Sequence, residues 1–236
     1  PGVTAQAWRW IRANLLGVPS SQPTAMLDNA PLRNLLQRTL HFGQIDEALQ
    51  AGVLQAVSVS AFGYQSAESV SFYQGRDRIQ PWSRHRRVGV QTRLGLEHLM
   101  ASSAIPLVFP PVQLNREWFG DGAVRQQAPI SPALHLGANR VLVIGVSDNL
   151  ANQPAGGRRG PRLRAALPPT LAQIGGHLLS STFVDNLEAD IELLERMNKL
   201  AGYLPVGSRM NGKGLRQVEV EVIPPSEPLD IIAARH

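Results

Sequence analysis

The residues best suited to chemistry surround one Asp-Gly pair, Asp121-Gly122, within residues 101–146. A positioned aspartate can take the proton of a serine hydroxyl if its surroundings keep the carboxylate basic. The aromatic pair Trp118-Phe119 precedes it, and this apolar segment could exclude water from a cleft that the carboxylate faces. The same dipeptide is also typical of a plain turn in which the aspartate caps the following backbone. Taken alone, these residues favour the turn.

The chain contains no complete catalytic signature. It has no GxxxxGK[ST] phosphate loop, GxGxxG dinucleotide turn, HExxH motif or EF-hand loop. It also has no GxSxG, the sharp strand-to-helix turn that exposes a serine nucleophile. Ser102 and Ser103 lack the flanking glycines, and we interpret them as turn residues that line the site. Cysteine is absent and the six histidines have no ligand spacing, so we expect neither thiol chemistry nor a metal site.

The composition is typical of a packed α/β chain. Its 236 residues are 43% hydrophobic and 17% charged, enough for one sizeable core. The net charge of +5 favours anionic partners, whether lipid headgroups or nucleic acid. No apolar run reaches the roughly eighteen residues of a membrane span. The chain begins Pro1-Gly2 without an initiator methionine, and we expect it to be a portion of a longer protein.

Hydrophobic periodicity predicts the elements that position the Asp-Gly pair. Helices are expected at residues 2–16, after Pro31, at 43–51, at 94–100 and at 170–197. The helix after Pro31 has a predicted buried stripe of Leu32, Leu35 and Leu36. A strand from Gly52 pairs in a hairpin with residues 70–73, and its predicted buried side is Val53, Val57, Val59 and Ala61. Residues 140–146 predict a strand covered on both faces, and residues 218–223 a final strand.

Two basic segments and one acidic helix have alternative interpretations. Residues 76–87 hold five arginines around Trp82, and residues 156–164 lie in a flexible basic loop near 151–169. Such segments either bind an anionic surface, with tryptophan at the lipid headgroups, or face water while the tryptophan caps the core. We favour the solvated interpretation for residues 76–87. The acidic residues of the helix at 170–197 are expected to form surface salt bridges and not a metal site.

Several segments resemble bacterial patatin-like phospholipases. The most specific are EHLMASSAIPLVFPPV and GDGAVRQQAPISPALHLGANRVLVIGV, which flank the Asp-Gly pair. The resemblance extends to MLDNAPLRNLL, to AVSVSA and SFYQG, and to LPPTLAQIGGHLL and LEADIELLERMN. Residues 1–236 are identified as the carboxy-terminal part of such a domain.

The resemblance implies a three-layer α/β/α sandwich with a mostly parallel central sheet, incomplete at its amino-terminal side. It implies a catalytic pair of a GxSxG serine and a DG[GA] aspartate, and Asp121, Gly122 and Ala123 match the second motif. The implied activity is hydrolysis of lipid or phospholipid acyl esters, with no cofactor and no metal. The serine and the Gly-rich oxyanion loop belong to an amino-terminal segment not in this sequence, so the chain is expected to be inactive alone. An anionic membrane surface is a further expected contact. Given the resemblance on both sides of the Asp-Gly pair, a catalytic role becomes the favoured interpretation of Asp121.

Two other classes of function stay open. The chain could be a non-catalytic lipid- or protein-binding module with the same fold, which depends on whether a GxSxG lies upstream. It could instead bind nucleic acid through its basic loops, which a salt-dependent shift with oligonucleotides would favour. Its aromatic residues are not interleaved as stacking platforms, and no basic helix has a groove-reading pattern, so no nucleic acid partner is expected.

Overall fold

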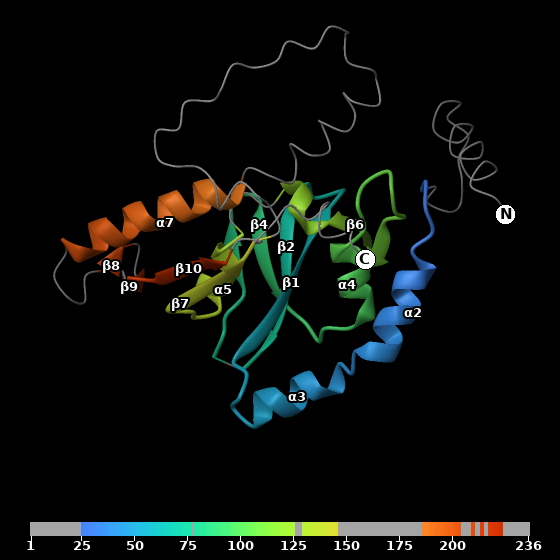
Figure 1. Cartoon of the computed structure of the whole chain (residues 1–236), viewed down its shortest axis with the longest axis horizontal. Helices are drawn as coiled ribbons and strands as arrows, with labels where there is room; N and C mark the ends of the chain where they lie inside the picture. Colours follow the sequence, from blue (N-terminus) through green and yellow to red (C-terminus); the bar gives the residue numbers. More distant parts are fainter. Residues whose placement is uncertain are drawn as a thin grey trace, which may run out of the picture. The chain divides into compact units, whose positions relative to one another are not determined.

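The computed structural model describes residues 25–76, 78–125, 129–145, 186–203, 209–210, 213–214 and 217–223. The chain forms two compact units, Pro1–Gln126 and Gln127–His236, and each is described by itself (Figure 1). Three predicted segments lie outside the described residues: the helix at 2–16, the basic loop at 151–169, and the part of the long helix at 170–185.

The first unit is built on a six-stranded sheet of order β3-β4-β2-β1-β6-β5. Its strands are β1 (Ala56–Gly63), β2 (Ser69–Gly75), β3 (Trp82–Arg84), β4 (Arg87–Gln91), β5 (Val112–Leu114) and β6 (Glu117–Asp121). The predicted hairpin is confirmed, because β1 and β2 pair antiparallel with Ala61 opposite Val70. The α/β class is also confirmed.

The prediction of a mostly parallel central sheet is not confirmed. In the described six-stranded sheet, β2 and β4 are parallel, whereas the β1–β2, β1–β6, β3–β4 and β5–β6 pairs are antiparallel. The reason is connection length. The β3–β4 and β5–β6 connections are the dipeptides His85-Arg86 and Asn115-Arg116. Connections this short can join only antiparallel neighbours, because a parallel crossover needs a dozen or more residues.

One face of this sheet carries the core of the first unit. The helices α2 (Ala30–Thr39), α3 (Gly43–Gln50) and α4 (Leu96–Ser102) lie beside the strands (Figure 1). Buried Met100 and Ala101 of α4 pack with sheet residues that alternate along their strands, as expected for one face. The buried cluster is Ala61, Val70, Phe72, Leu94, Met100, Ala101, Ala104, Val112, Leu114 and Phe119. Leu32, Leu36, Ile45, Val57 and Val59 pack against it.

Two residues predicted to be buried are exposed, so those predictions are wrong. Val53 is 85% exposed because the strand begins only at Ala56. Gly52 has a φ of +75°, and this turn after α3 leaves Val53 before the sheet starts. Leu35 is 57% exposed, since α2 contacts the core cluster through Leu32 and Leu36.

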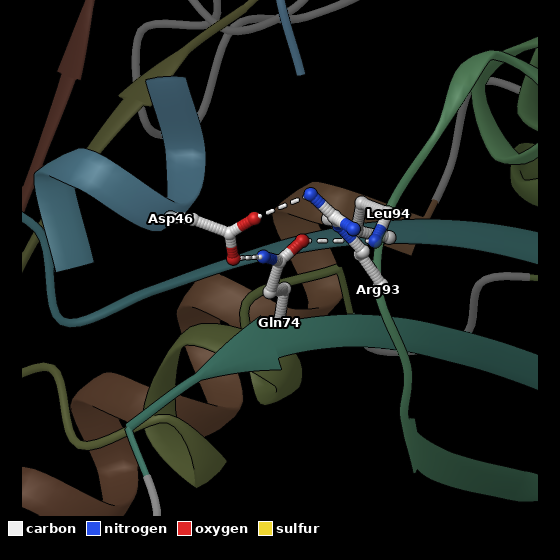
Figure 2. A network of polar contacts seen from close by, with 4 residues as sticks. All are labelled: Asp46, Gln74, Arg93 and Leu94. Atoms are coloured by element: carbon white, nitrogen blue, oxygen red, sulfur yellow. Dashed lines mark hydrogen bonds and ion pairs between the residues drawn. The ribbon is translucent and has the colours of Figure 1, made fainter. Parts of the chain in front are cut away.

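A buried glutamine joins β2 to the segment that leads into α4. Gln74 is 8% exposed, and its side-chain oxygen accepts a hydrogen bond from the backbone N–H of Leu94 at 2.9 Å. Its amide nitrogen donates to Asp46 of α3, which also accepts a hydrogen bond from Arg93 at 2.9 Å (Figure 2). The buried amide is therefore satisfied on both sides, as buried polar groups require. These contacts hold the entry to α4 against the sheet.

The basic segment places its tryptophan inside the first unit. Trp82 is 8% exposed and stacks on Tyr73, with ring centroids 5.2 Å apart. The side chains of Arg78, Arg84 and Arg86 are exposed. Trp82 therefore packs in the core, as the solvated interpretation predicted, and is not presented at the surface. Whether the exposed arginines bind an anionic surface stays a prediction.

The second unit contains a small parallel sheet and a long helix. Its elements are α5 (Ser131–His135), β7 (Arg140–Ile144), α7 (Asn186–Gly202), β8 (Arg209–Met210), β9 (Lys213–Gly214) and β10 (Glu219–Ile223), with β7 and β10 parallel. Asn198 of α7 exchanges hydrogen bonds with the backbone of Val218 at 2.9 and 2.7 Å. The predicted strand at 140–146 is present as Arg140–Ile144, and the described residues leave one of its faces open, because Leu142 and Ile144 are 57% and 74% exposed.

The acidic residues of α7 have structural partners. Glu192 pairs with Arg196 one turn later, so the predicted surface salt bridge is confirmed there. Asp190 instead accepts a hydrogen bond from the backbone N–H of Ile130 at 2.9 Å. Across the described ranges, no three His, Cys, Asp or Glu side chains gather as metal ligands. In those same ranges, no helix has the length and apolar character that crossing a bilayer requires.

Candidate active site around Asp121

Asp121 ends strand β6 and is held by two neighbouring elements of the first unit. In the sheet it lies opposite Ala61 of β1. Its backbone N–H donates to the carbonyl oxygen of Ala104 at 2.9 Å, so the turn that follows α4 lies against the strand end. Directly paired residues share a face of an antiparallel sheet. Asp121 therefore lies on the face of Ala61 and Phe119, beneath α4.

The two carboxylate oxygens of Asp121 have different surroundings. Oδ1 accepts a hydrogen bond from the backbone N–H of Ala123 at 2.8 Å, which caps the 3₁₀ turn η1 (Gly122–Arg125). Within the part of the chain that the structure describes, Oδ2 has no hydrogen-bond partner. The turn-capping interpretation from the sequence is therefore correct for one oxygen, while the other is free of hydrogen bonds from the described residues and can accept one from a hydroxyl.

Position 122 must be glycine because the backbone of β1 lies too close to it for any side chain. A Cβ at this position would lie 2.2 Å from the carbonyl oxygen of Ser60 in β1 and 3.2 Å from the backbone nitrogen of Ala61. Gly122 is not needed for a left-handed backbone, because the positive-φ glycines of the described chain are Gly52 and Gly137. Only the missing side chain lets η1 pack onto β1, and this contact sets the direction in which the chain leaves Asp121.

Partial burial raises the pKa of the Asp121 carboxyl, and the hydrogen bond from Ala123 lowers it by a smaller amount. Burial raises the pKa because a charged carboxylate loses solvation when water is removed from around it. A carboxylate with a raised pKa is a stronger proton acceptor once it is ionised. The surroundings of Asp121 therefore suit a general base better than a fully exposed aspartate would.

If Asp121 acts as a general base, the rate of its reaction should rise with pH through an apparent pKa above the ordinary aspartate value, because a base acts only when ionised. The effect on stability has the opposite sign. A carboxyl with a raised folded-state pKa stabilises the fold below its unfolded pKa, and this contribution is lost as pH rises through the folded value. A pH–rate profile of kcat/KM tests the first effect, and an acid limb at the ordinary aspartate pKa would contradict it. Unfolding of wild type and Asp121→Asn across that pH range tests the second.

The predicted site-lining serines belong to the end of α4. Ser102 is the last residue of the helix and is partly buried. The Ser103 hydroxyl donates to the carbonyl oxygen of Leu99 at 2.8 Å, so its hydrogen bond is to the backbone of the helix that it follows. The contact between this turn and Asp121 is made by the backbone of the next residue, Ala104.

Tyr64 directly follows β1 and packs on β6, the strand that ends in Asp121. Its backbone N–H donates to the carbonyl oxygen of Trp118 at 3.0 Å. A Cβ on Gly120 would lie 2.4 Å from the Tyr64 hydroxyl oxygen, so the phenol lies over the residue that precedes Asp121. No local pattern could reveal this contact, because the two positions are more than fifty residues apart.

A cavity in the first unit lies elsewhere. It measures about 490 Å³ and is lined by Asp46, Gln50, Gln74, Gly75, Gln91, Thr92 and Arg93. Gly75 pairs with Ala56 at the start of β1, whereas Asp121 pairs with Ala61. Five residues of strand span about 17 Å. The cavity is therefore separate from the carboxylate, and three of its polar side chains, those of Asp46, Gln74 and Arg93, belong to the Gln74 network.

Comparison with known proteins identifies the family. The family model described as patatin-like phospholipase matches residues 5–134, which is more than half of the chain and includes Asp121, Gly122, Ala123 and both serines. A search of curated proteins finds no match. The family predicted from the segments around the Asp-Gly pair is confirmed: the chain belongs to the patatin-like phospholipases.

Proposed function

We propose that this chain carries the general base of a Ser-Asp catalytic pair that hydrolyses lipid acyl esters, and that Asp121 is this base. Membership of the patatin-like phospholipase family supports a lipid hydrolase. The observation that carries the assignment is the carboxylate itself. One oxygen is fixed by Ala123, the other has no partner in the described chain, and partial burial raises the pKa of the group.

The proposed reaction needs a serine hydroxyl, and these 236 residues contain no GxSxG. We therefore propose that another segment of the protein supplies the serine. Asp121 Oδ2 accepts the hydroxyl proton while the serine oxygen bonds to the ester carbonyl carbon. The tetrahedral intermediate then collapses, and the leaving alcohol takes the proton from Asp121. Water then attacks the carbonyl carbon of the acyl-serine while the same carboxylate takes a proton from the water. The second tetrahedral intermediate collapses, the bond between the acyl carbon and the serine oxygen breaks, and Asp121 returns the proton to that oxygen as the fatty acid leaves.

The fixed oxygen explains how an aspartate can act without a histidine between it and the serine. The hydrogen bond from Ala123 and the backbone contact with Ala104 hold the carboxylate in one orientation. A base held in position loses less conformational freedom when the substrate arrives. The same bond cannot serve as a proton route, because a backbone amide does not ionise, so proton transfer uses Oδ2.

The test is fatty-acid release by the intact protein, including its upstream segment, from a p-nitrophenyl ester and from a phospholipid. We expect turnover of at least one substrate, and none by residues 1–236 alone. No release of acid from either substrate by the folded intact protein would rule out the hydrolase function. It would favour the alternative of a non-catalytic lipid- or protein-binding module, which the absence of GxSxG from this sequence supports.

We also propose peripheral contact with anionic membranes through the exposed arginines of residues 76–87. Arg76, Arg78, Arg84 and Arg86 are exposed, and basic side chains near an anionic surface each contribute about 1 kcal/mol. In a sedimentation assay, vesicles with acidic lipid should bind the protein more tightly than neutral vesicles, and salt should weaken the difference. Replacing Arg78, Arg84 and Arg86 with glutamine should reduce it. Equal sedimentation with both kinds of vesicle would remove this proposal.

A further inference from the structure

The cavity beside the Gln74 network is a second candidate binding site in the first unit. Its lining comes from three elements: one face of α3, the end of β2 and the segment that follows β4. Asp46 and Gln50 are four residues apart in α3, so their side chains lie on the same face of the helix. The volume of about 490 Å³ falls within the roughly 300–1,000 Å³ of pockets that bind small molecules. The cavity is therefore large enough for a small ligand.

The side chains at the base of the cavity are fixed by hydrogen bonds. Gln74 is 8% exposed, and its two amide atoms join the backbone of Leu94 to the carboxylate of Asp46 (Figure 2). Arg93 donates to the second oxygen of Asp46 at 2.9 Å, so the guanidinium is directed toward the same carboxylate. A ligand would meet side chains that are already held in place, which lowers the conformational entropy lost on binding.

Several polar groups of the cavity keep unused hydrogen-bonding capacity. Each carboxylate oxygen of Asp46 accepts one hydrogen bond and has a further lone pair. In the part of the chain that the structure describes, the Gln50 amide and the Thr92 hydroxyl have no hydrogen-bond partner. Among the same residues, Arg93 donates through a single nitrogen, which leaves its other N–H groups free. Gln50 and Arg93 are exposed, so a ligand can approach them from solvent.

The charges of the cavity disfavour an ion as its ligand. Asp46 and Arg93 are the charged residues of the lining, and they pair with each other, so the lining is neutral in sum. An anion beside Arg93 would also meet the carboxylate, and a cation beside Asp46 would meet the guanidinium. A neutral hydroxyl has neither cost, because it can donate to Asp46 and accept from Gln50 or Arg93. This combination favours a ligand that carries several hydroxyl groups.

We propose that this cavity binds a neutral polyhydroxyl compound, either a free sugar or the sugar headgroup of a glycolipid. The carboxylate of Asp46 accepts hydrogen bonds from the ligand, and the Gln50 amide and the Arg93 guanidinium donate to it. The cavity is separate from the strand end that carries Asp121, so this binding goes beyond the proposed hydrolase function and does not depend on it. Because each hydrogen bond formed in water stabilises a complex only slightly, we expect a dissociation constant of about 1–10 mM for a single sugar.

The first experiment titrates D-glucose into the intact protein and follows the side-chain amide signals of its glutamines by NMR. Gln50→Met removes the carboxamide and keeps a long side chain of similar helix propensity, so the melting temperature should stay the same. Gln44→Met is the matched control, since Gln44 is exposed on the same helix and does not line the cavity. We expect saturable shifts of the Gln50 and Gln74 amide signals in the wild type. Followed through Gln74, glucose should bind about tenfold more weakly to Gln50→Met and unchanged to Gln44→Met. No saturable shift, or equal affinity of Gln50→Met and wild type, would overturn the proposal.

The second experiment tests the charge of the ligand and its source. At fixed ionic strength, inorganic phosphate and ethylammonium should each bind about tenfold more weakly than glucose, and tighter binding of either ion would overturn the neutral class. Sedimentation with phosphatidylcholine vesicles, with and without a monoglucosyl diacylglycerol, separates the two sources. A preference for the glycolipid that Gln50→Met removes assigns the site to a lipid headgroup. Glucose binding without such a preference assigns it to soluble sugars.

Discussion

Asp121→Asn in the intact protein is expected to abolish ester hydrolysis while leaving the melting temperature nearly unchanged. Asparagine keeps an oxygen that can accept the hydrogen bond from Ala123, so the cap on η1 is preserved. It cannot accept a proton from serine, and the loss of a general base lowers the rate about 10²- to 10⁴-fold. At neutral pH the variant also avoids the cost of ionising a partly buried carboxyl, so its stability should not fall.

Asp28→Asn is the matched control for this variant. Asp28 also accepts a hydrogen bond from the backbone N–H two residues later, Ala30, at 2.9 Å, but it is exposed and precedes α2. Both variants exchange a capping aspartate for an amide, and only one of them is expected to lose activity. Hydrolysis of a p-nitrophenyl ester and a thermal unfolding curve measure the two effects. Retained turnover in Asp121→Asn would remove Asp121 from the mechanism.

Gly122→Ala is expected to destabilise the first unit and to abolish hydrolysis together. The added methyl group would lie 2.2 Å from the Ser60 carbonyl oxygen, and neither backbone can move without disturbing the sheet. Overpacking of this kind costs about 1–3 kcal/mol of unfolding free energy. Relief of the clash must move η1 away from β1, which moves the Asp121 carboxylate as well. Denaturant unfolding and the ester assay measure both consequences.

Gly43→Ala separates the clash from the general effect of replacing glycine. Gly43 is the first residue of α3, and a Cβ there would meet nothing within 4 Å. Alanine restricts the unfolded chain, so this variant should be neutral or about 0.4–1 kcal/mol more stable. If Gly122→Ala is as stable and active as Gly43→Ala, then close approach to β1 is not what requires glycine in the DG[GA] motif.

The sequence by itself determined the features that depend on neighbouring residues. The alternation of small and apolar residues on either side of a short loop predicted the β1–β2 hairpin, because each strand must turn one face to the core. Pro31 after an Asx residue predicted the start of α2. The Asp-Gly-Ala motif and its flanking segments predicted the family, which the match over residues 5–134 confirms. The role of Asp121 stays a prediction.

Local sequence patterns gave wrong predictions of burial where the exact start of a strand, or its neighbours in the fold, determined whether a side chain is exposed. Val53 is apolar at the correct spacing but precedes the strand, because Gly52 places a turn there. Residues 141–144 are apolar on both faces of the strand, yet among the described residues Leu142 and Ile144 are exposed. Hydrophobicity alone therefore did not predict which face of this strand is buried. Family resemblance predicted a parallel sheet, while the two-residue connections of this region impose antiparallel pairs.

Only the tertiary structure decided how the parts of the site meet. Asp121 is oriented by Ala104 at the end of α4 and by the approach of Gly122 to Ser60, and these contacts join positions far apart in the chain. Tyr64 reaches Gly120 for the same reason. Periodicity records which face a residue turns to the core, but not which backbone lies opposite it. Those long-range contacts fix the strand end, while the local bond from Ala123 caps one carboxylate oxygen and leaves the other available for the proposed chemistry.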